Sequence, residues 1–257
     1  MNNLPRLILI SGWAHGTPAM EDLGKCLEGA ANFSYVTTGD LWRPEQPAGS
    51  QSACARNLAV MIEKTSGKVF IAGWSLGGMI ALETAFHRPD LFNGLVLISS
   101  TAKFCSGPGW PAGIPPAVLR TMTRKFKRDR KEVLRDFFRN VAMPSAETDE
   151  NILLKIEKAC AMNPLELSAG LEYLSEADLR GKIVKLKVPA LVLHGRQDLV
   201  IPAEAGMALK DMLALSKIRV YDNYGHGLPW QNPRAVAGDI KEFLQECRKR
   251  DTQQARL

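Results

Sequence analysis

The chain reads Phe70-Ile71-Ala72-Gly73-Trp74-Ser75-Leu76-Gly77-Gly78 and continues into a helix-forming run, Met79-Ile80-Ala81-Leu82-Glu83. An apolar strand, a Gly-Xaa-Ser-Xaa-Gly turn and a helix in this order are typical of a sharp bend that holds its serine in a strained conformation. Gly73 and Gly77 leave room around that bend because they have no side chains. Ser75 is therefore a candidate nucleophile, although an idle serine in a glycine-rich turn fits this motif alone equally well.

Two further motifs carry the other groups that an activated serine needs. The apolar strand Leu191-Val192-Leu193-His194-Gly195 leads to Asp198, and the alternating strand Ile218-Arg219-Val220-Tyr221 leads to His226, which lies between two glycines. Each group follows a strand, and the carboxyl ends of parallel strands meet at one edge of a sheet. Since a serine hydroxyl is a poor nucleophile at neutral pH, we expect His226 to be its base and Asp198 to orient the imidazole.

Backbone N–H groups at two places are expected to stabilise a developing oxyanion. The helix that begins after Ser75 presents the free N–H of Leu76. The strand Leu7-Ile8-Leu9-Ile10 ends in a glycine-rich loop, Ser11-Gly12-Trp13-Ala14-His15-Gly16. We assign the second donor to the N–H of Trp13 in this loop. Loss of one such donor typically costs about 3 to 4 kcal/mol of transition-state stabilisation.

Strands and helices alternate along most of the chain, which predicts a parallel sheet covered by helices. The interval 102–182 interrupts this alternation with four prolines between positions 108 and 116 and then with helical stretches. We expect a core of residues 1–101 and 183–257, with residues 102–182 inserted as a helical cap over Ser75. Strands are expected at 6–11, 33–37, 69–73, 94–99, 189–194 and 217–221, and helices at 19–29, 51–65, 76–87, 203–214 and 233–249.

Together these motifs resemble those of the α/β-hydrolase superfamily. Nearly the whole chain is similar to one of its groups, the pimeloyl-acyl-carrier-protein methyl ester esterases of biotin synthesis. That likeness rests on Gly12-Trp13, on the turn at 73–78, on Val96-Leu97-Ile98-Ser99-Ser100 and on the stretch 171–180. It implies an α/β-hydrolase fold in which serine, acid and histidine form a catalytic triad in this order along the chain.

The resemblance also implies which residues contact the substrate. Trp13 and Leu76 match positions that bind substrate in the family, beside the expected nucleophile Ser75 and base His226. The cap segment Phe137-Phe138-Arg139-Asn140-Val141 resembles the segment that lines the acyl site.

The chain departs from the family pattern at two points. Its oxyanion loop reads Ser11-Gly12-Trp13 where the family usually has His-Gly-Trp, a change that the backbone donor can survive. Its first strand begins almost at once, at Leu4-Pro5-Arg6-Leu7, where most relatives have a β-hairpin first. We therefore expect a mostly parallel sheet shortened by two strands at its N-terminal edge. Because this edge is far from Ser75, the expected consequence is reduced stability or an exposed edge more than lost catalysis.

Basic residues in the cap predict either a solvated helix face or a docking surface. Arg128, Lys131, Arg135 and Arg139 recur at helical spacing and form what we call the basic stripe. A stripe of this kind beside a cleft raises the encounter rate with an anionic partner. The resemblance implies that this partner is the acyl-carrier protein that bears the ester. We expect no nucleic-acid partner, because no recognised binding motif accompanies the basic residues.

Composition agrees with a single enzyme domain, since 257 residues with 46% hydrophobic content can bury one large core. We expect no contact with a membrane, because neither a spanning apolar run nor a signal peptide is evident. The five cysteines are scattered along the chain, which favours reduced thiols and a cytoplasmic protein. We expect a monomer that uses no cofactor and no metal.

The sequence thus predicts a serine carboxylesterase that hydrolyses the methyl ester of pimeloyl-acyl-carrier protein through an acyl-enzyme on Ser75. A general short-chain carboxylesterase is the alternative among enzymes. A non-catalytic ligand receptor on the same fold is the alternative from another class. His15, His87 and His194 are expected to be structural.

Overall fold

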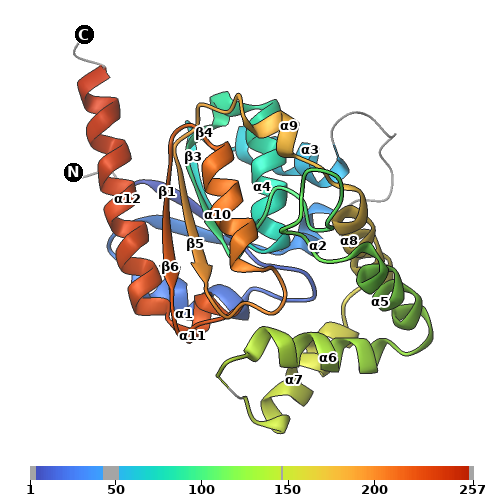
Figure 1. Ribbon diagram of the computed structural model, residues 1–257. Helices are drawn as coiled ribbons and strands as arrows, with labels where there is room; N and C mark the ends of the chain where they lie inside the picture. The colour runs from blue at the N-terminus through green and yellow to red at the C-terminus, as the bar shows by residue number, and fades with distance from the viewer. Residues whose placement is uncertain (1–3, 43–51, 146, 255–257) are drawn as a thin grey trace.

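The computed structural model describes residues 4–42, 52–145 and 147–254, and its centre is a β-sheet with helices on both faces (Figure 1). The six strands lie in the order β2-β1-β3-β4-β5-β6, and every described pair is parallel. Each strand begins and ends within two residues of its expected bounds. The strands are β1 (Arg6–Ile10), β2 (Asn32–Val36), β3 (Val69–Trp74), β4 (Phe92–Ile98), β5 (Ala190–Gly195) and β6 (Ser216–Tyr221).

Helices cover the sheet in two layers that bury separate apolar clusters. α1 (Pro18–Leu27) and α12 (Pro233–Gln254) lie on one face, with the short α11 (Leu228–Gln231). The other face carries α3 (Ala53–Glu63), α4 (Leu76–His87) and α10 (Ala203–Met212). The sheet is thus covered on both faces, and β3 is buried along its whole length, which explains why its sequence is almost continuously apolar. Three shorter elements complete this part of the fold: α2 (Thr38–Leu41), the 3-10 turn η1 (Pro89–Leu91) and α9 (Arg180–Ile183).

Four further helices lie between β4 and β5, in the interval expected to form a cap. They are α5 (Pro116–Arg128), α6 (Arg130–Ala142), α7 (Asp149–Cys160) and α8 (Pro164–Glu176). Figure 1 shows α5, α6 and α7 at the lower right, outside the two layers that cover the sheet. We propose that residues 102–182 form the cap. Within the described ranges, no helix is both long enough and apolar enough to cross a membrane.

The basic stripe is divided between two helices, so the expectation that one helix face carries it is wrong. Asp129 has φ −140° and ψ 88°, which ends α5 after Arg128. The Asp129 Oδ1 then accepts the backbone N–H of Glu132 at 3.0 Å and caps the first turn of α6. Lys131, Arg135 and Arg139 remain on α6, whereas Arg128 belongs to the end of α5.

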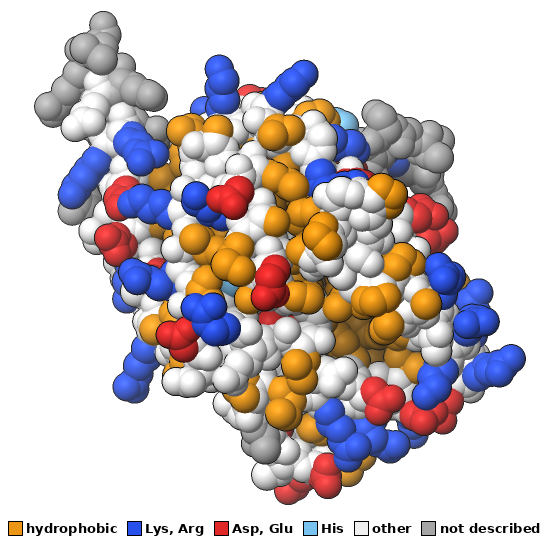
Figure 2. All heavy atoms as spheres, viewed as in Figure 1, with side chains coloured by type: hydrophobic (Ala, Val, Ile, Leu, Met, Phe, Trp, Pro, Cys, Tyr) orange, Lys and Arg blue, Asp and Glu red, His pale blue; other side chains and the backbone are white. Residues whose placement is uncertain are grey.

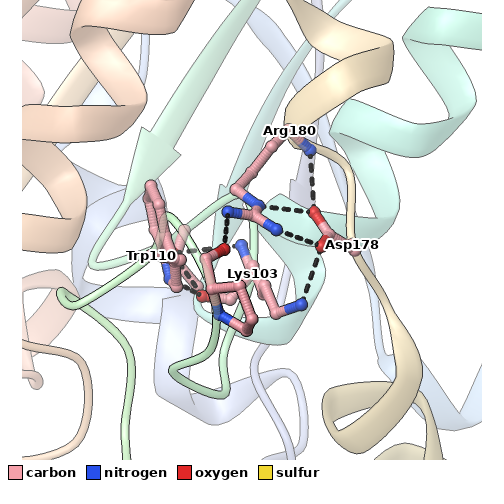
Figure 3. Close-up of polar contacts among 6 residues, drawn as sticks. Lys103, Trp110, Asp178 and Arg180 are labelled. Atoms are coloured by element: carbon pink, nitrogen blue, oxygen red, sulfur yellow. Dashed lines mark hydrogen bonds and ion pairs between the residues drawn. The ribbon is translucent and has the colours of Figure 1, made fainter.

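An ion-pair cluster joins residues near the two ends of the interval 102–182 (Figure 3). Lys103 Nζ lies 2.7 Å from Asp178 Oδ2, and Arg180 donates to both oxygens of the same carboxylate at 2.8 and 2.7 Å. The Trp110 indole donates to the carbonyl of Lys103 at 2.9 Å, and its ring lies 5.8 Å from the Arg180 guanidinium. The hydrogen bonds from Arg180, more than those from Lys103, hold the pKa of Asp178 below its ordinary value, although partial burial opposes this.

Asp178→Asn is expected to lower the free energy of unfolding by about 1 to 2 kcal/mol. Lys103 and Arg180 would lose the carboxylate charge that joins the two ends of the interval 102–182. Urea unfolding at pH 7 measures the change. Asp211→Asn is the matched control, since its pair with Lys210 is largely exposed. We expect the control to cost less than about 0.5 kcal/mol. Equal losses in the two variants would contradict a special role for the cluster.

Candidate active site

Ser75 lies at the bend between β3 and α4, with φ 55° and ψ −120°. A positive φ is unfavourable for a residue with a side chain, so surrounding contacts must sustain it. The Ser75 N–H donates to the carbonyl of Ile98 at 2.8 Å, and its own carbonyl accepts the Ser100 hydroxyl at 2.8 Å. Ile98 is the last residue of β4 and Ser100 follows two residues later, so the neighbouring strand and the segment after it hold the bend in place.

The bend excludes side chains at the glycines beside Ser75, as inferred from the sequence. A Cβ on Gly73 would lie 2.6 Å from the backbone of α4, closer than real Cβ contacts. A Cβ on Gly12 would lie 3.1 Å from the Ser75 Cβ, so the loop after β1 runs directly against the nucleophile turn. A Cβ on Gly77 would lie 2.6 Å from the carbonyl oxygen of Ser11, so two segments far apart in the chain pack closely around Ser75.

The structure brings Asp198 and His226 into direct contact. Both side chains are buried, and His226 Nδ1 lies 2.8 Å from Asp198 Oδ2. Asp198 Oδ1 accepts the backbone N–H groups of Val200 and Ile201 at 2.8 and 2.9 Å. Burial acts to raise the pKa of Asp198, but the interaction with His226 and the hydrogen bonds from His194 and His226 outweigh it, so this pKa lies below its ordinary value. The carboxylate is therefore ionised and orients the imidazole.

The other ring nitrogen of His226 is buried and has no hydrogen-bond partner among the described residues, Ser75 included. Trp74, the residue before the nucleophile, donates from its indole to the His226 carbonyl at 2.9 Å. This bond ties the histidine loop to the nucleophile turn. Because hydrogen bonds between catalytic groups are often formed only once substrate is present, an open Nε2 is compatible with a base that receives the serine proton.

His194, which the sequence analysis expected to be structural, contacts Asp198, and the sequence did not show this contact. Its Nε2 lies 3.4 Å from Asp198 Oδ2 and 2.9 Å from the carbonyl of Ile201. The available signal was the spacing of four residues between His194 and Asp198 across a strand end. Spacing alone could not show that both side chains turn back to the same place.

The two residues assigned to the oxyanion hole present unused donors. Leu76 begins α4, and the first N–H groups of a helix have no partner within it. Among the described backbone groups, none accepts the N–H of Leu76 or that of Trp13. Since the loop that carries Trp13 packs against Ser75 through Gly12, both donors lie next to the nucleophile turn.

A cavity of about 300 Å³ separates the core from the proposed cap and reaches Ser75. Figure 2 shows a hollow on the viewed face, beside α5 and α6, with hydrophobic side chains around it. Most of its wall comes from α5, α6 and α8. The lining residues are Trp13, Ser75, Phe104, Ile114, Val118, Leu119, Thr121, Met122, Lys125, Val133, Asp136, Phe137, Asn140, Leu171, Leu174, Leu199 and Val200.

The segment expected to line the acyl site meets this cavity at two positions, Phe137 and Asn140. Phe138 and Val141 are buried away from it. Arg139 is exposed and pairs with Asp149 at 3.3 Å. A helix turns its residues through about 100° each, so five consecutive positions cannot share one face. The sequence analysis did not assign the apolar residues of α5 and α8 to the acyl site, because helical spacing does not show which face of a helix meets the cavity.

His15 is buried in a cage of aromatic rings beside the site. Its ring centre lies 4.5 Å from that of Trp74, 5.0 Å from Phe138 and 5.7 Å from Trp230. Its Nδ1 lies 2.8 Å from the carbonyl of Trp13. Burial lowers the pKa of His15 to about 3, although the bond to Trp13 opposes this, so the ring is neutral and supports the oxyanion loop.

Residues 7–239 match the model of a family described as the alpha/beta hydrolase family. The chain belongs to this family. Pimeloyl-[acyl-carrier protein] methyl ester esterase of Vibrio cholerae is 30% identical over 241 residues, covering 92% of this chain and 93% of the relative. The protein of the same name from Nitrosomonas europaea is 26% identical over 234 residues, covering 87% and 89%.

Among solved structures, an esterase from Exiguobacterium antarcticum matches this alpha/beta hydrolase with a TM-score of 0.84. The match covers 95% of this chain and 93% of the other at 19% identity, and it shows the shared fold. The predicted fold class and the resemblance are confirmed, and with relatives named as esterases the protein is a carboxylic ester hydrolase. Among the described residues, His, Cys, Asp and Glu side chains form no group of three or more suited to a metal ion.

The buried His15 predicts that acid destabilises the fold. The unfolded chain binds a proton at His15 near pH 6.5, whereas the folded protein binds it only near pH 3. Stability from this group is complete above pH 6.5 and falls by up to about 1.4 kcal/mol per pH unit below it. His15→Asn is expected to flatten the dependence of the unfolding free energy on pH between 6.5 and 4.5, measured by urea unfolding. An unchanged slope in the variant would contradict this assignment.

Proposed function

We propose that this alpha/beta hydrolase is a serine carboxylesterase that hydrolyses the methyl ester of pimeloyl-acyl-carrier protein through an acyl-enzyme on Ser75. The observation that carries the serine mechanism is the buried Asp198–His226 pair. The Nε2 of His226 has no hydrogen-bond partner among the described residues, and the backbone of His226 is bonded to Trp74 beside Ser75. The choice of substrate is supported by the relatives named above, which share nearly the whole length of the chain. We propose a monomer, and we propose that it is cytoplasmic, in keeping with five cysteines that form no disulfide with one another.

Acylation begins when Ser75 Oγ attacks the ester carbonyl carbon and passes its proton to His226 Nε2. Asp198 stabilises the imidazolium that forms, because its carboxylate is ionised and accepts a hydrogen bond from Nδ1–H of His226. The carbonyl oxygen becomes negatively charged and accepts hydrogen bonds from the N–H groups of Trp13 and Leu76. When the tetrahedral intermediate collapses, His226 returns the proton to the methoxy oxygen and methanol leaves.

Deacylation repeats these proton transfers with water as the nucleophile. His226 takes a proton from the attacking water, and the same two N–H groups stabilise the second oxyanion. The bond between the acyl carbon and Ser75 Oγ then breaks, and the serine recovers its proton from His226. The product is a free carboxylate at the end of the acyl chain that was esterified.

The apolar cavity suits a medium-length acyl chain. Most of the residues that line it have aliphatic or aromatic side chains. A pimeloyl chain has five methylene groups, whose full burial contributes about 4 kcal/mol at about 0.8 kcal/mol each. Exposed apolar side chains of Val118 and Leu199 line the same cavity, so its mouth can accept the arm of a carrier-bound substrate.

We propose that the basic stripe receives the acidic carrier protein. Arg128, Lys131 and Arg139 are exposed and Arg135 is half-buried. They lie on α5 and α6, the helices that also wall the cavity. A carrier drawn to this surface therefore arrives beside the cavity mouth, and the attraction raises the association rate without adding contacts at the ester.

Ser75→Ala is expected to lower kcat for a small ester such as p-nitrophenyl butyrate by about 10⁴-fold or more, because the nucleophile is lost. A fluorophosphonate probe should label the native protein and leave the variant unlabelled. In a biotin auxotroph that lacks this esterase step, the native gene should restore growth and the variant should not. A native protein that neither hydrolyses esters nor reacts with the probe would favour the ligand receptor.

Lys131→Glu is expected to lower kcat/KM for the carrier-bound methyl ester by about ten-fold at low ionic strength, because it reverses one charge of the basic stripe. Activity on p-nitrophenyl butyrate should not change. Lys68→Glu is the matched control, since Lys68 is exposed just before β3, at the end of this strand away from Ser75. A native protein with no preference for the carrier-bound ester would instead favour a general short-chain carboxylesterase.

A further inference from the structure

One face of α8 is turned toward the oxyanion loop and the cavity. Leu171 and Leu174 line the cavity, and the carbonyl of Leu167 accepts the Trp13 indole N–H at 2.8 Å. Gly170 lies on the same face, three residues after Leu167 and four before Leu174. This face therefore meets the substrate space and the loop that carries one oxyanion donor.

Gly170 is in close contact with the side chains of both residues assigned to the oxyanion hole. A Cβ at this position would lie 2.6 Å from Trp13 Cδ1 and 3.1 Å from Trp13 Nε1. The same Cβ would lie 3.3 Å from Leu76 Cδ2. The first of these distances is shorter than real Cβ contacts, so any side chain at position 170 must displace the indole or the helix.

The Trp13 indole has little space in which to move. It is 3% exposed, and its ring packs edge-on against Phe137 of α6 at 4.9 Å and Phe126 of α5 at 5.8 Å. Leu76 is completely buried. Because packed interiors transmit displacement, a shift of the indole is passed to the backbone of its loop, where the N–H donor lies.

We propose that α8 positions the oxyanion hole and that Gly170 is a positioning residue, which acts through Trp13 and Leu76. The inference rests on the proposed serine mechanism and adds that the cap sets the geometry of the donors as well as the shape of the acyl site. Donors must lie at hydrogen-bond distance from the oxyanion, and removing one lowers kcat by about 10² to 10³-fold. A displaced donor loses part of that effect.

Gly170→Ala tests this directly. We expect kcat for p-nitrophenyl butyrate to fall by about ten- to a hundred-fold, with KM changed by less than about two-fold, because the donors act mainly on the transition state. Affinity for a trifluoromethyl ketone, which forms a tetrahedral adduct with the serine, should fall by a similar factor. The thermal midpoint should fall by no more than a few degrees, because the close contact is destabilising and the higher helix propensity of alanine offsets part of that loss.

Gly181→Ala is the matched control, since a Cβ there meets nothing within 4 Å. It should leave kcat and ketone affinity unchanged. If Gly170→Ala folds and binds the ketone as tightly as the native protein, the inference is wrong. If Gly170→Ala does not fold, Trp13→Phe decides, because it removes the indole donor to Leu167 and retains an aromatic ring. Native ketone affinity in that variant would also overturn the inference.

These outcomes are separate from a failure of the proposed function. If the Ser75→Ala variant hydrolyses esters as fast as the native protein, the serine mechanism is overturned, whatever the effect of Gly170→Ala. Serine-dependent hydrolysis with no effect of Gly170→Ala would overturn only the role of α8.

Discussion

The bend at Ser75 is the constraint on which the rest of the site depends. A non-glycine residue with positive φ costs about 1 to 3 kcal/mol and persists only where its surroundings hold it. Here the holding contacts come from the end of β4 and the segment after it, through Ile98 and Ser100, and from the loop after β1, which packs against the bend at Gly12. The same bend begins α4, so the strained position of the serine and the free N–H beside it have one cause.

The acid and the histidine are held by a second set of contacts that reaches the cap. Asp198 can remain ionised inside the protein because two backbone N–H groups and two histidines surround it. Just beyond it, Ile201 and Ala205 pack against Trp110, which is buried and bonded to the stem of the inserted segment at Lys103. The proposed cap therefore contacts the loop of Asp198 through Trp110 and the loop after β1 through Trp13. Both connections join cap and core, which suits a site that lies between them.

Most of the sheet could be predicted from the sequence because its signals are local. Apolar runs mark the central strands, and alternating apolar and polar residues mark β2 and β6. Ser75, Asp198 and His226 each follow a strand at which the chain must change direction. The helix boundaries of the proposed cap, residues 102–182, were harder to predict. The pattern of its basic stretch predicts one amphipathic helix, whereas the structure has two helices, α5 and α6. They are separate because the Asp129 side chain accepts a hydrogen bond from the first turn of α6. A capping residue in the middle of a helical pattern is a weak signal, because the same aspartate can equally lie on an exposed helix face.

The amino-acid sequence by itself determined the order of strands and helices along the chain, the fold family and the three side chains proposed as a catalytic triad. Those features follow from periodicity and from short motifs whose steric demands are local. Tertiary structure alone decided that His194 shares the carboxylate of Asp198, that two residues of the segment 137–141 meet the cavity, and that Gly170 lies against both oxyanion residues. These contacts join positions that are distant in the chain or depend on the rotation of one helix against another. Side-chain packing, rather than any local pattern, selects them.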